Sequence, residues 1–243
     1  MIGLILAAAG SGSRFGSHVP KQFLYLHDTP VYQHALTPFV SLCSPLVVVV
    51  PSAWKHRVSR ELQSAGFPAI VTSGGEERQD SVYRGFCELG DNVDLVLVHD
   101  AARPFVSTSL ISRVIEQAGL TGACVPGVQI AETVKEIEEE GKVVRTLRRE
   151  SLRLIQTPQG FGRALLGRAL AKALREDVRA SDEAVLIERL GMPVQVIPGE
   201  ISNVKITWPE DGGGLMLAGD LGEAPSLAGP LVKEGRSPSG KRR

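Results

Sequence analysis

The sequence predicts a doubly wound α/β fold, in which helices cover both faces of a mostly parallel sheet. Three short apolar runs predict its central strands, and none shows the polar alternation of a half-exposed strand: GLILAAA at 3–9, PLVVVV at 45–50 and DLVLVHD at 94–100. Such runs are typical of parallel strands that are buried on both faces. In folds of this class, ligands bind at the carboxyl ends of the strands.

Two later segments have the apolar spacing of amphipathic helices. The first is expected over residues 107–119, with a stripe of Leu110, Ile111, Val114, Ile115 and Ala118 and with Gly119 at its end. The second is expected over residues 163–177, with a stripe of Leu166, Leu170, Ala173 and Leu174. They supply helices for the layers around the sheet.

Residues 132–150 interrupt this pattern, because two β-prone arms flank a charged turn at 138–142 that contains a glycine. That arrangement predicts a hairpin, and its few large apolar residues indicate that it projects from the main sheet. Two interpretations remain open: a plain surface hairpin, or an arm that grips another subunit. Residues 222–243 mix Gly, Pro, Ser and basic residues without periodicity, which predicts a disordered tail after a folded part at 1–221.

The bulk composition excludes several classes of function. Lys+Arg and Asp+Glu number 27 each, so no overall charge draws the chain to nucleic acid or to an anionic membrane. No apolar run reaches the ~18 residues of a membrane helix, and the apolar start lacks the basic flank of a signal peptide. Three cysteines without C-x-x-C spacing predict a reducing compartment, and five histidines without i, i+4 pairs argue against zinc.

The first strand runs into a glycine-rich loop, LILAAAGSGSRFGSHVPKQF at 4–23. Its spacing, Gly10-x-Gly12-x-x-x-Gly16, is neither the dinucleotide fingerprint nor the P-loop of nucleotide hydrolases. Backbone N–H groups in such a loop can bind a triphosphate, while Arg14 and Lys21 offset charge at a reacting phosphorus. The plainer alternative is a solvated loop with ordinary surface cations.

Asp100 follows a buried strand in the segment LVLVHDAARPF, at the strand end where α/β enzymes place their chemistry. A lone carboxylate there suits Mg²⁺, which keeps several waters and shares phosphate oxygens. Arg103 follows, and Pro104 restricts the chain after it. Asp100 could instead cap a helix or form a turn.

Two further segments have weaker signals. In SGGEERQDSV at 73–82, Gly74 and Gly75 offer N–H groups and Ser81 a hydroxyl, enough to read the edge of a base; a loop with a helix cap is the alternative. In NVKITWPED at 203–211, Lys205 is expected on a short strand, as a third cation for phosphates or as an ordinary exposed lysine.

Taken together and in order, these segments resemble the 2-C-methyl-D-erythritol 4-phosphate cytidylyltransferases of the non-mevalonate isoprenoid route. The similar stretches also include ETVKE, TPQGF and SDEA, and they span residues 2–217. The resemblance implies a Rossmann-like nucleotidyltransferase fold and a bacterial, cytoplasmic enzyme. It also implies that CTP is joined to a sugar-alcohol phosphate, that pyrophosphate is released, and that Mg²⁺ or another divalent cation takes part.

The resemblance also assigns roles to individual residues. Arg14, Lys21 and Lys205 would be catalytic cations at the phosphates. The nucleotide would be held by Ala8, Ala9, Gly10, Ser11, Gly12, Gly75, Glu76 and Ser81. The second substrate would be bound by Asp100, Arg103, Thr133, Arg149, Thr157 and Ser181, with Asp100 also placing the metal ion. Some of these come from the partner's arm in this family, so the resemblance implies a homodimer through residues 130–151 and a composite site.

The sequence departs from the family pattern at three positions. Glu76 stands where aspartate is usual, Ser181 replaces a common threonine, and Trp208 stands where arginine is frequent. The closest alternative is a ribitol 5-phosphate cytidylyltransferase, in which a bulkier residue is common at the position of Ala102. A catalytically inactive binding protein of the same fold is the other alternative, and the cations and Asp100 argue against it.

Overall fold

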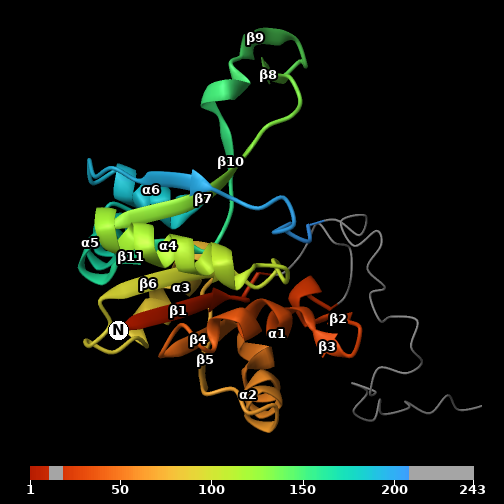
Figure 1. Cartoon of the computed structure of the whole chain (residues 1–243), viewed down its shortest axis with the longest axis vertical. Helices are drawn as coiled ribbons and strands as arrows, with labels where there is room; N and C mark the ends of the chain where they lie inside the picture. The colour runs from red at the N-terminus through yellow and green to blue at the C-terminus, as the bar shows by residue number, and fades with distance from the viewer. Residues whose placement is uncertain (11–18, 208–243) are drawn as a thin grey trace, which may run out of the picture.

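A computed structural model describes residues 1–10 and 19–207, and eight strands within these residues form one sheet (Figure 1). The order is β10-β7-β11-β6-β1-β4-β5, and β12 also pairs with β7. The strands are β1 Ile2–Ala7, β4 Leu46–Val50, β5 Ala69–Ser73, β6 Leu95–Asp100, β7 Ala123–Gln129, β10 Arg153–Ile155, β11 Gln159–Gly162 and β12 Gln195–Pro198. The pairs β1–β4, β1–β6, β4–β5 and β7–β12 are parallel, whereas β11 and β10 pair antiparallel with their neighbours. The prediction of a mostly parallel sheet is confirmed.

Helices cover both faces of this sheet. They are α1 Val31–Leu36, α2 Lys55–Ser64, α3 Arg78–Cys87, α4 Thr108–Thr121, α5 Arg163–Arg175 and α6 Glu183–Glu188. In β1, Leu4 and Leu6 pack in one core with α1, α2 and α4, whereas Ile5 packs in the other with α3, α5 and α6. Successive strand residues point to opposite faces, so two apolar layers require the uninterrupted apolar run that the sequence contains. The doubly wound fold is confirmed.

Short elements complete the described chain. They are β2 Tyr25–Leu26, β3 Thr29–Pro30, and the 3-10 helices η2 Lys21–Phe23, η3 Thr37–Phe39, η4 Ser52–Trp54 and η5 Arg149–Ser151. No helix within residues 1–10 and 19–207 combines the length and the apolar character that a membrane crossing requires.

Both predicted helices form, with two corrections at the residue level. Gly119 lies inside α4, which continues to Thr121 and ends at Gly122, where φ is 84°. Gly122 can adopt this left-handed conformation without steric cost, and Gly119 needs no special φ. In α5, Leu174 is 63% exposed and does not join the buried stripe, whose last member is Ala173.

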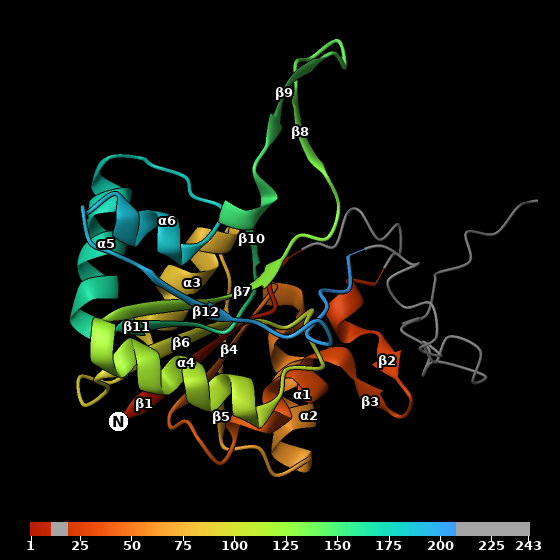
Figure 2. The same cartoon turned by 45° about the horizontal axis from the view of Figure 1, so that its top comes forward.

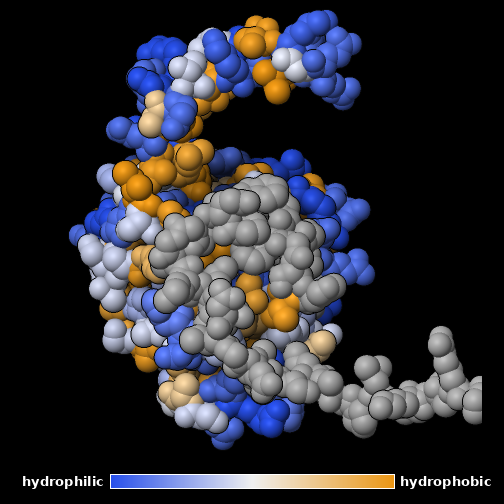
Figure 3. All heavy atoms as spheres, turned by 90° about the vertical axis from the view of Figure 1, so that its right-hand side faces the viewer, coloured by the Kyte–Doolittle hydropathy of each residue, from blue (hydrophilic) through white to orange (hydrophobic). Residues whose placement is uncertain are grey.

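The predicted hairpin forms and projects from the body as an arm (Figures 1 and 2). Its strands, β8 Val134–Ile137 and β9 Val143–Leu147, form a separate antiparallel pair. The turn is closed by the Glu138 N–H, which donates to the Lys142 carbonyl. Figure 3 shows apolar atoms along the arm and around its base, and the exposed residues there are Ile137, Val143, Val144, Leu154 and Ile155.

The carboxyl ends of β1 and β6 meet at the centre of the sheet. Ala7 is paired with Asp100 on one side of β1 and with Val49 on the other. Because β1 connects onward to β4 while β6 lies on its opposite side, this is the point where the order of the strands reverses. Open α/β sheets bind ligands at such a point.

Candidate active site

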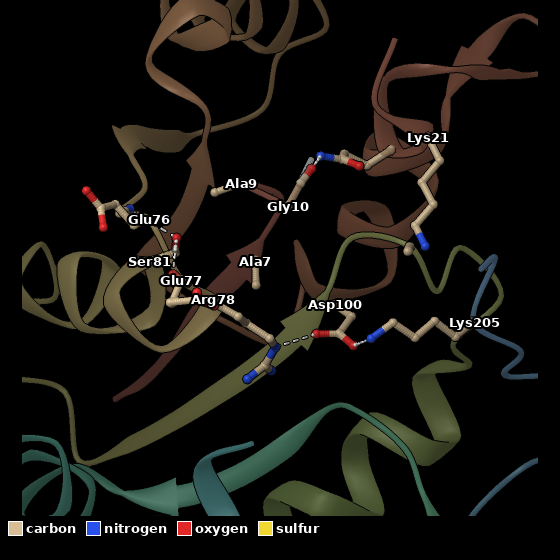
Figure 4. Close-up of a pocket in the computed structure, with 13 residues that line it drawn as sticks. Ala7, Ala9, Gly10, Lys21, Glu76, Glu77, Arg78, Ser81, Asp100 and Lys205 are labelled. Carbon is tan, nitrogen blue, oxygen red and sulfur yellow. Dashed lines mark hydrogen bonds and ion pairs between the residues drawn. The ribbon is translucent and has the colours of Figure 1, made fainter. Parts of the chain in front are cut away.

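A cavity of about 340 Å³ opens at the carboxyl ends of β1 and β6 (Figure 4). It is lined by eight of the residues that the sequence predicted for the site: Ala9, Gly10, Lys21, Gly75, Glu76, Ser81, Asp100 and Lys205. These residues come from four separate segments of the chain, which the fold brings together. Ser11, Gly12 and Arg14 of the predicted site, and Trp208 beside it, lie outside the described residues.

Asp100 is held between two cations on the floor of the cavity. Its Oδ1 accepts a hydrogen bond of 3.1 Å from Arg78 Nε, and its Oδ2 accepts one of 2.7 Å from Lys205 Nζ. Burial by itself raises the pKa of this carboxyl, but the charges of Arg78 and Lys205 outweigh burial and lower the pKa below its ordinary value. Asp100 is therefore ionised, and both of its oxygens carry a cationic partner.

Lys205 reaches Asp100 from an irregular segment, so the prediction that it lies on a short strand was wrong. The segment is held by other contacts: Ile206 N–H donates to the Ala102 carbonyl, and the buried Asn203 donates from Nδ2 to the Thr157 carbonyl. These tertiary hydrogen bonds take the place of strand pairing. The β-prone residues around Lys205 therefore do not form a strand. Lys205 lines the same cavity as Lys21, and its role as a third cation for phosphates stays a prediction.

Arg78 and Glu183 were missed by the sequence reasoning. Arg78 Nη1 donates to both oxygens of Glu183, at 2.8 and 3.0 Å, while its Nε binds Asp100. Glu183 is 1% exposed, and burial raises its pKa more than the charge of Arg78 lowers it. Arg78 lies in the segment SGGEERQDSV and Glu183 in the segment SDEA. Because the two residues are 105 positions apart, no local sequence pattern predicts their ion pair.

The turn before α3 forms the side of the cavity opposite the two lysines (Figure 4). Ser81 Oγ accepts a hydrogen bond from the Gly75 N–H at 3.1 Å and donates to the Glu77 carbonyl at 3.0 Å. A Cβ at Gly74 would lie 2.3 Å from that of Ala9, which explains a glycine where this turn approaches the loop after β1. Asp80 and Glu77 form a capping box at the start of α3. The turn that caps this helix is therefore also the turn that lines the cavity.

Thr157 and Arg103 lie beneath the cavity rather than on its wall. Thr157 Oγ1 accepts a hydrogen bond of 3.0 Å from the Asp100 N–H, and it forms a second hydrogen bond of 3.0 Å with His99 Nδ1. Arg103 is buried and donates from Nη1 to the Asn203 carbonyl at 2.7 Å. Ala8 is also buried, beside the cavity wall. These three predicted residues therefore support the described site from behind.

Three predicted substrate-binding residues are exposed and do not line the cavity of this single chain. Thr133 and Arg149 lie on the arm and at its base, and Arg149 Nη1 donates to the Ala131 carbonyl. Ser181 precedes α6, whose N-cap is Asp182. The side chain that caps this helix is therefore that of Asp182, not that of Ser181.

The described residues contain no cluster of three or more histidine, cysteine, aspartate or glutamate side chains that could hold a metal ion by themselves. Asp100 is a single carboxylate with Arg78 and Lys205 on its oxygens. This donor set fits a divalent cation that shares phosphate oxygens and keeps water ligands, which is how Mg²⁺ commonly binds. It does not fit a permanently bound structural metal.

Comparison with known proteins agrees with the resemblance seen in the sequence. The family model described as IspD: 2-C-methyl-D-erythritol 4-phosphate cytidylyltransferase matches residues 2–218. An enzyme of that name from Syntrophus aciditrophicus is 38% identical over 213 residues, covering 85% of this chain and 91% of the relative. A "Bifunctional enzyme IspD/IspF" from Anaeromyxobacter sp. is 41% identical over 99% of this chain and 62% of its own length.

Solved structures give the same result. The crystal structure of 2-C-methyl-D-erythritol 4-phosphate cytidylyltransferase from Thermus thermophilus superposes with a TM-score of 0.74 at 37% identity, covering 86% of this chain and 94% of the other. The structure of the bifunctional IspDF from Campylobacter jejuni has a TM-score of 0.73 at 28% identity. The chain belongs to the 2-C-methyl-D-erythritol 4-phosphate cytidylyltransferase family.

Proposed function

We propose that this enzyme transfers the CMP group of CTP to 2-C-methyl-D-erythritol 4-phosphate. The products are 4-diphosphocytidyl-2-C-methyl-D-erythritol, an intermediate of isoprenoid biosynthesis, and pyrophosphate. The observation that carries the proposal is the cavity between the loop after β1 and Asp100, with Lys21 and Lys205 on its wall, in a chain that matches this family over residues 2–218.

The chemistry requires little acid–base catalysis. A phosphate oxygen of the acceptor attacks the α-phosphorus of CTP, a new P–O bond forms, and the bond from that phosphorus to the bridging oxygen of the β-phosphate breaks. The acceptor phosphate is already a nucleophilic anion, so catalysis depends on alignment and on neutralising charge. Accordingly, the described residues that line the cavity include cations and carboxylates but no histidine or cysteine.

Lys21 and Lys205 are the described cations placed for this work, with Arg14 assigned by the family resemblance. Lys205 is held at 2.7 Å from Asp100, which orders the amine before substrate arrives. Preorganised charge of this kind stabilises a transition state more than a mobile side chain does, because no reorganisation is needed during the reaction. We assign Lys21 and Arg14 to the reacting phosphorus and the leaving pyrophosphate, and Lys205 to the phosphates where the substrates meet.

The charge balance supports the involvement of a divalent cation. Among the described residues that line the cavity, Lys21, Arg78 and Lys205 contribute three positive charges, and Glu76, Glu77 and Asp100 contribute three negative ones, so their formal charges balance. A triphosphate carries several negative charges, so Mg²⁺ bound to its oxygens would supply the remaining neutralisation. Asp100 is the residue we assign to hold it, and the two cations on its oxygens favour contact through water.

Nucleotide recognition is assigned to the two loops on either side of the cavity. The backbone of residues 8–12 would bind the triphosphate, and Gly75, Glu76 and Ser81 would bind the cytosine. The hydroxyl of Ser81 already supports the Gly75 N–H, so Ser81 would act partly by shaping this turn. Asp100 would also position acceptor hydroxyls, with Arg103 and Thr157 behind it.

We also propose that the enzyme is a cytoplasmic homodimer in which the arm at 130–151 contacts the partner. Three apolar arm residues, Ile137, Val143 and Val144, are each at least 58% exposed, and exposed apolar clusters indicate protein contacts. Thr133 and Arg149 lie away from the cavity of their own chain. This position suits residues that reach the site of the other subunit and complete it together with Ser181 of that subunit.

Pyrophosphate release from CTP, Mg²⁺ and methylerythritol phosphate tests this function. The wild type should turn over, and Lys21→Ala should be slower by orders of magnitude because it removes a charge from the reacting phosphates. Lys55→Ala, on the exposed start of α2, is the matched control and should keep the wild-type rate. A wild-type rate in Lys21→Ala would refute the role of Lys21.

A further inference from the structure

We propose that Gln22 is a positioning residue that orients the backbone of residues 8–10, at the start of the glycine-rich loop, toward the triphosphate. This inference rests on the proposed function, because it specifies how the loop is prepared for CTP. It differs from the role of Lys21 next to it, since the amide of Gln22 acts on the protein backbone and needs no contact with substrate.

The amide of Gln22 binds two loop carbonyls at once. Its Nε2 donates to the Ala8 carbonyl and to the Gly10 carbonyl, each at 2.7 Å. The side chain is 4% exposed, so these hydrogen bonds are shielded from competing water. An amide NH₂ group has two donor protons, and both are used here. Gln22 therefore fixes the start of the loop at two points.

The position of Gln22 is itself set by the aromatic residues around it. The next residue, Phe23, stacks on Trp54 with ring centroids 4.1 Å apart and an interplanar angle of 4°. Phe23 also meets the ring of Tyr32 edge-on at 5.8 Å, and it is 4% exposed. The side chain of Gln22 thus projects from a packed 3-10 helix, and it is the loop that must adjust to the amide.

The bound carbonyls determine where the neighbouring N–H group points. In a planar trans peptide the C=O of one residue and the N–H of the next point in opposite directions. Since the Ala8 carbonyl faces Gln22, the N–H of Ala9 faces away from Gln22, and Ala9 lines the cavity. Backbone N–H groups that face a cavity bind anions. The same 3-10 helix carries Lys21, so one element supplies a cation to the cavity and holds the backbone that carries the Ala9 N–H.

Two substitutions separate this role from simple packing. Gln22→Met keeps the length and bulk of the side chain but removes both hydrogen bonds. We expect it to raise the KM for CTP about tenfold, equivalent to about 1.4 kcal/mol, with the KM for the acceptor changed less than about twofold. Gln22→Glu places acceptor oxygens against two carbonyls while the carboxylate is ionised, and a protonated carboxyl can again donate one hydrogen bond.

Gln22→Glu therefore has a distinct pH signature. Its rate relative to wild type should be low at neutral and higher pH, where the carboxylate is ionised, and should recover as pH falls and the carboxyl group gains its proton. The control is Gln63→Glu, an equal change of charge at an exposed position of α2, which should follow the wild-type profile. Circular dichroism establishes that each variant is folded; if Gln22→Met does not fold, the pH profile of Gln22→Glu decides.

A Gln22→Met enzyme with the wild-type KM for CTP, or a Gln22→Glu enzyme with the wild-type pH profile, would overturn the inference. Failure of the proposed function would be visible separately, as a wild type that is inactive with CTP and methylerythritol phosphate. In that case CTP binding measured by calorimetry tests Gln22 directly: weaker binding to Gln22→Met than to Gln63→Glu supports the positioning role, and equal binding overturns it.

Discussion

At the scale of single residues, Asp100 is positioned by a hydrogen-bond chain that its sequence neighbours only partly reveal. The chain runs from the Asp100 N–H to Thr157 Oγ1, then to His99 Nδ1, and from His99 Nε2 to the Arg103 carbonyl. A carbonyl can only accept, so Nε2 carries the proton and Nδ1 accepts from the threonine hydroxyl. Burial lowers the pKa of His99 to about 4, which keeps the ring neutral at pH 7.

Removal of this hydroxyl should disturb Asp100 without touching substrate. Thr157→Val keeps the shape but leaves the buried Asp100 N–H and His99 Nδ1 without their partner, so we expect a loss of about 1–3 kcal/mol in the free energy of unfolding. We also expect a lower kcat, because the carboxylate shifts. Thr157→Ser retains the hydroxyl and should remain close to wild type in denaturant melts and in turnover. Equal behaviour of the two variants would contradict the hydrogen-bond chain.

At the scale of elements, the first turn of α3 fastens an irregular segment that precedes α6. Arg78 holds Glu183. Gln79 donates to the Val178 carbonyl and accepts from the Ala180 N–H, and Asp80 pairs with Arg179. Three consecutive residues of one helix thus hold residues 178–183, which include Ser181. The other side of the same turn forms the nucleotide wall of the cavity.

This fastening predicts that Gln79 affects the acceptor more than the nucleotide. Gln79→Met removes two hydrogen bonds to the backbone of the segment, worth about 1 kcal/mol each, and frees the residues next to Ser181. We expect the KM for methylerythritol phosphate to rise several-fold while the KM for CTP stays near wild type. Steady-state kinetics with each substrate varied in turn measures the difference, and Gln63→Met on the exposed face of α2 is the control. An equal rise in both values would contradict the assignment.

Elements that are buried on all sides could be predicted from sequence, and those defined by tertiary contacts could not. The run at Val47–Val50 is fully buried between two helical layers, so its composition alone specified β4. β11 reads QGFG and β12 reads QVIP, and neither is apolar enough to stand out from a loop. Lys21, Asp100 and Lys205 each lie in a segment with a recognisable local pattern, so they could be predicted from sequence. The ion pair of Arg78 with Glu183 joins residues far apart in sequence, so no local pattern could predict it.

At the scale of the whole molecule, the arm separates two groups of predicted site residues. The cavity contains the cations and Asp100, whereas Thr133 and Arg149 lie with the arm, which extends away from the body (Figure 2). A homodimer joined through its arms would bring the two groups together from different chains. The exposed apolar residues on β8 and β9 would then be covered by the partner.

A composite site of this kind predicts complementation between subunits. Arg14→Ala and Arg149→Ala homodimers should each be slow, because one lacks a cation at the reacting phosphorus and the other lacks an acceptor contact. In mixed dimers, one of the two sites receives both wild-type residues, so mixing the variants should restore part of the activity. Differently tagged subunits verify the exchange. No recovery despite demonstrated exchange would show that each chain completes its own site.

Cytidylyl transfer to methylerythritol phosphate is distinguished from the alternatives by assaying two acceptors side by side. Methylerythritol phosphate and ribitol 5-phosphate are supplied in separate assays with CTP and Mg²⁺. Pyrophosphate release gives the rate of turnover, and phosphorus NMR identifies the product. We predict faster turnover of methylerythritol phosphate and a diphosphate-linked cytidine product, both lost in Lys21→Ala. Faster turnover of ribitol phosphate, or no pyrophosphate from either acceptor, would contradict the account.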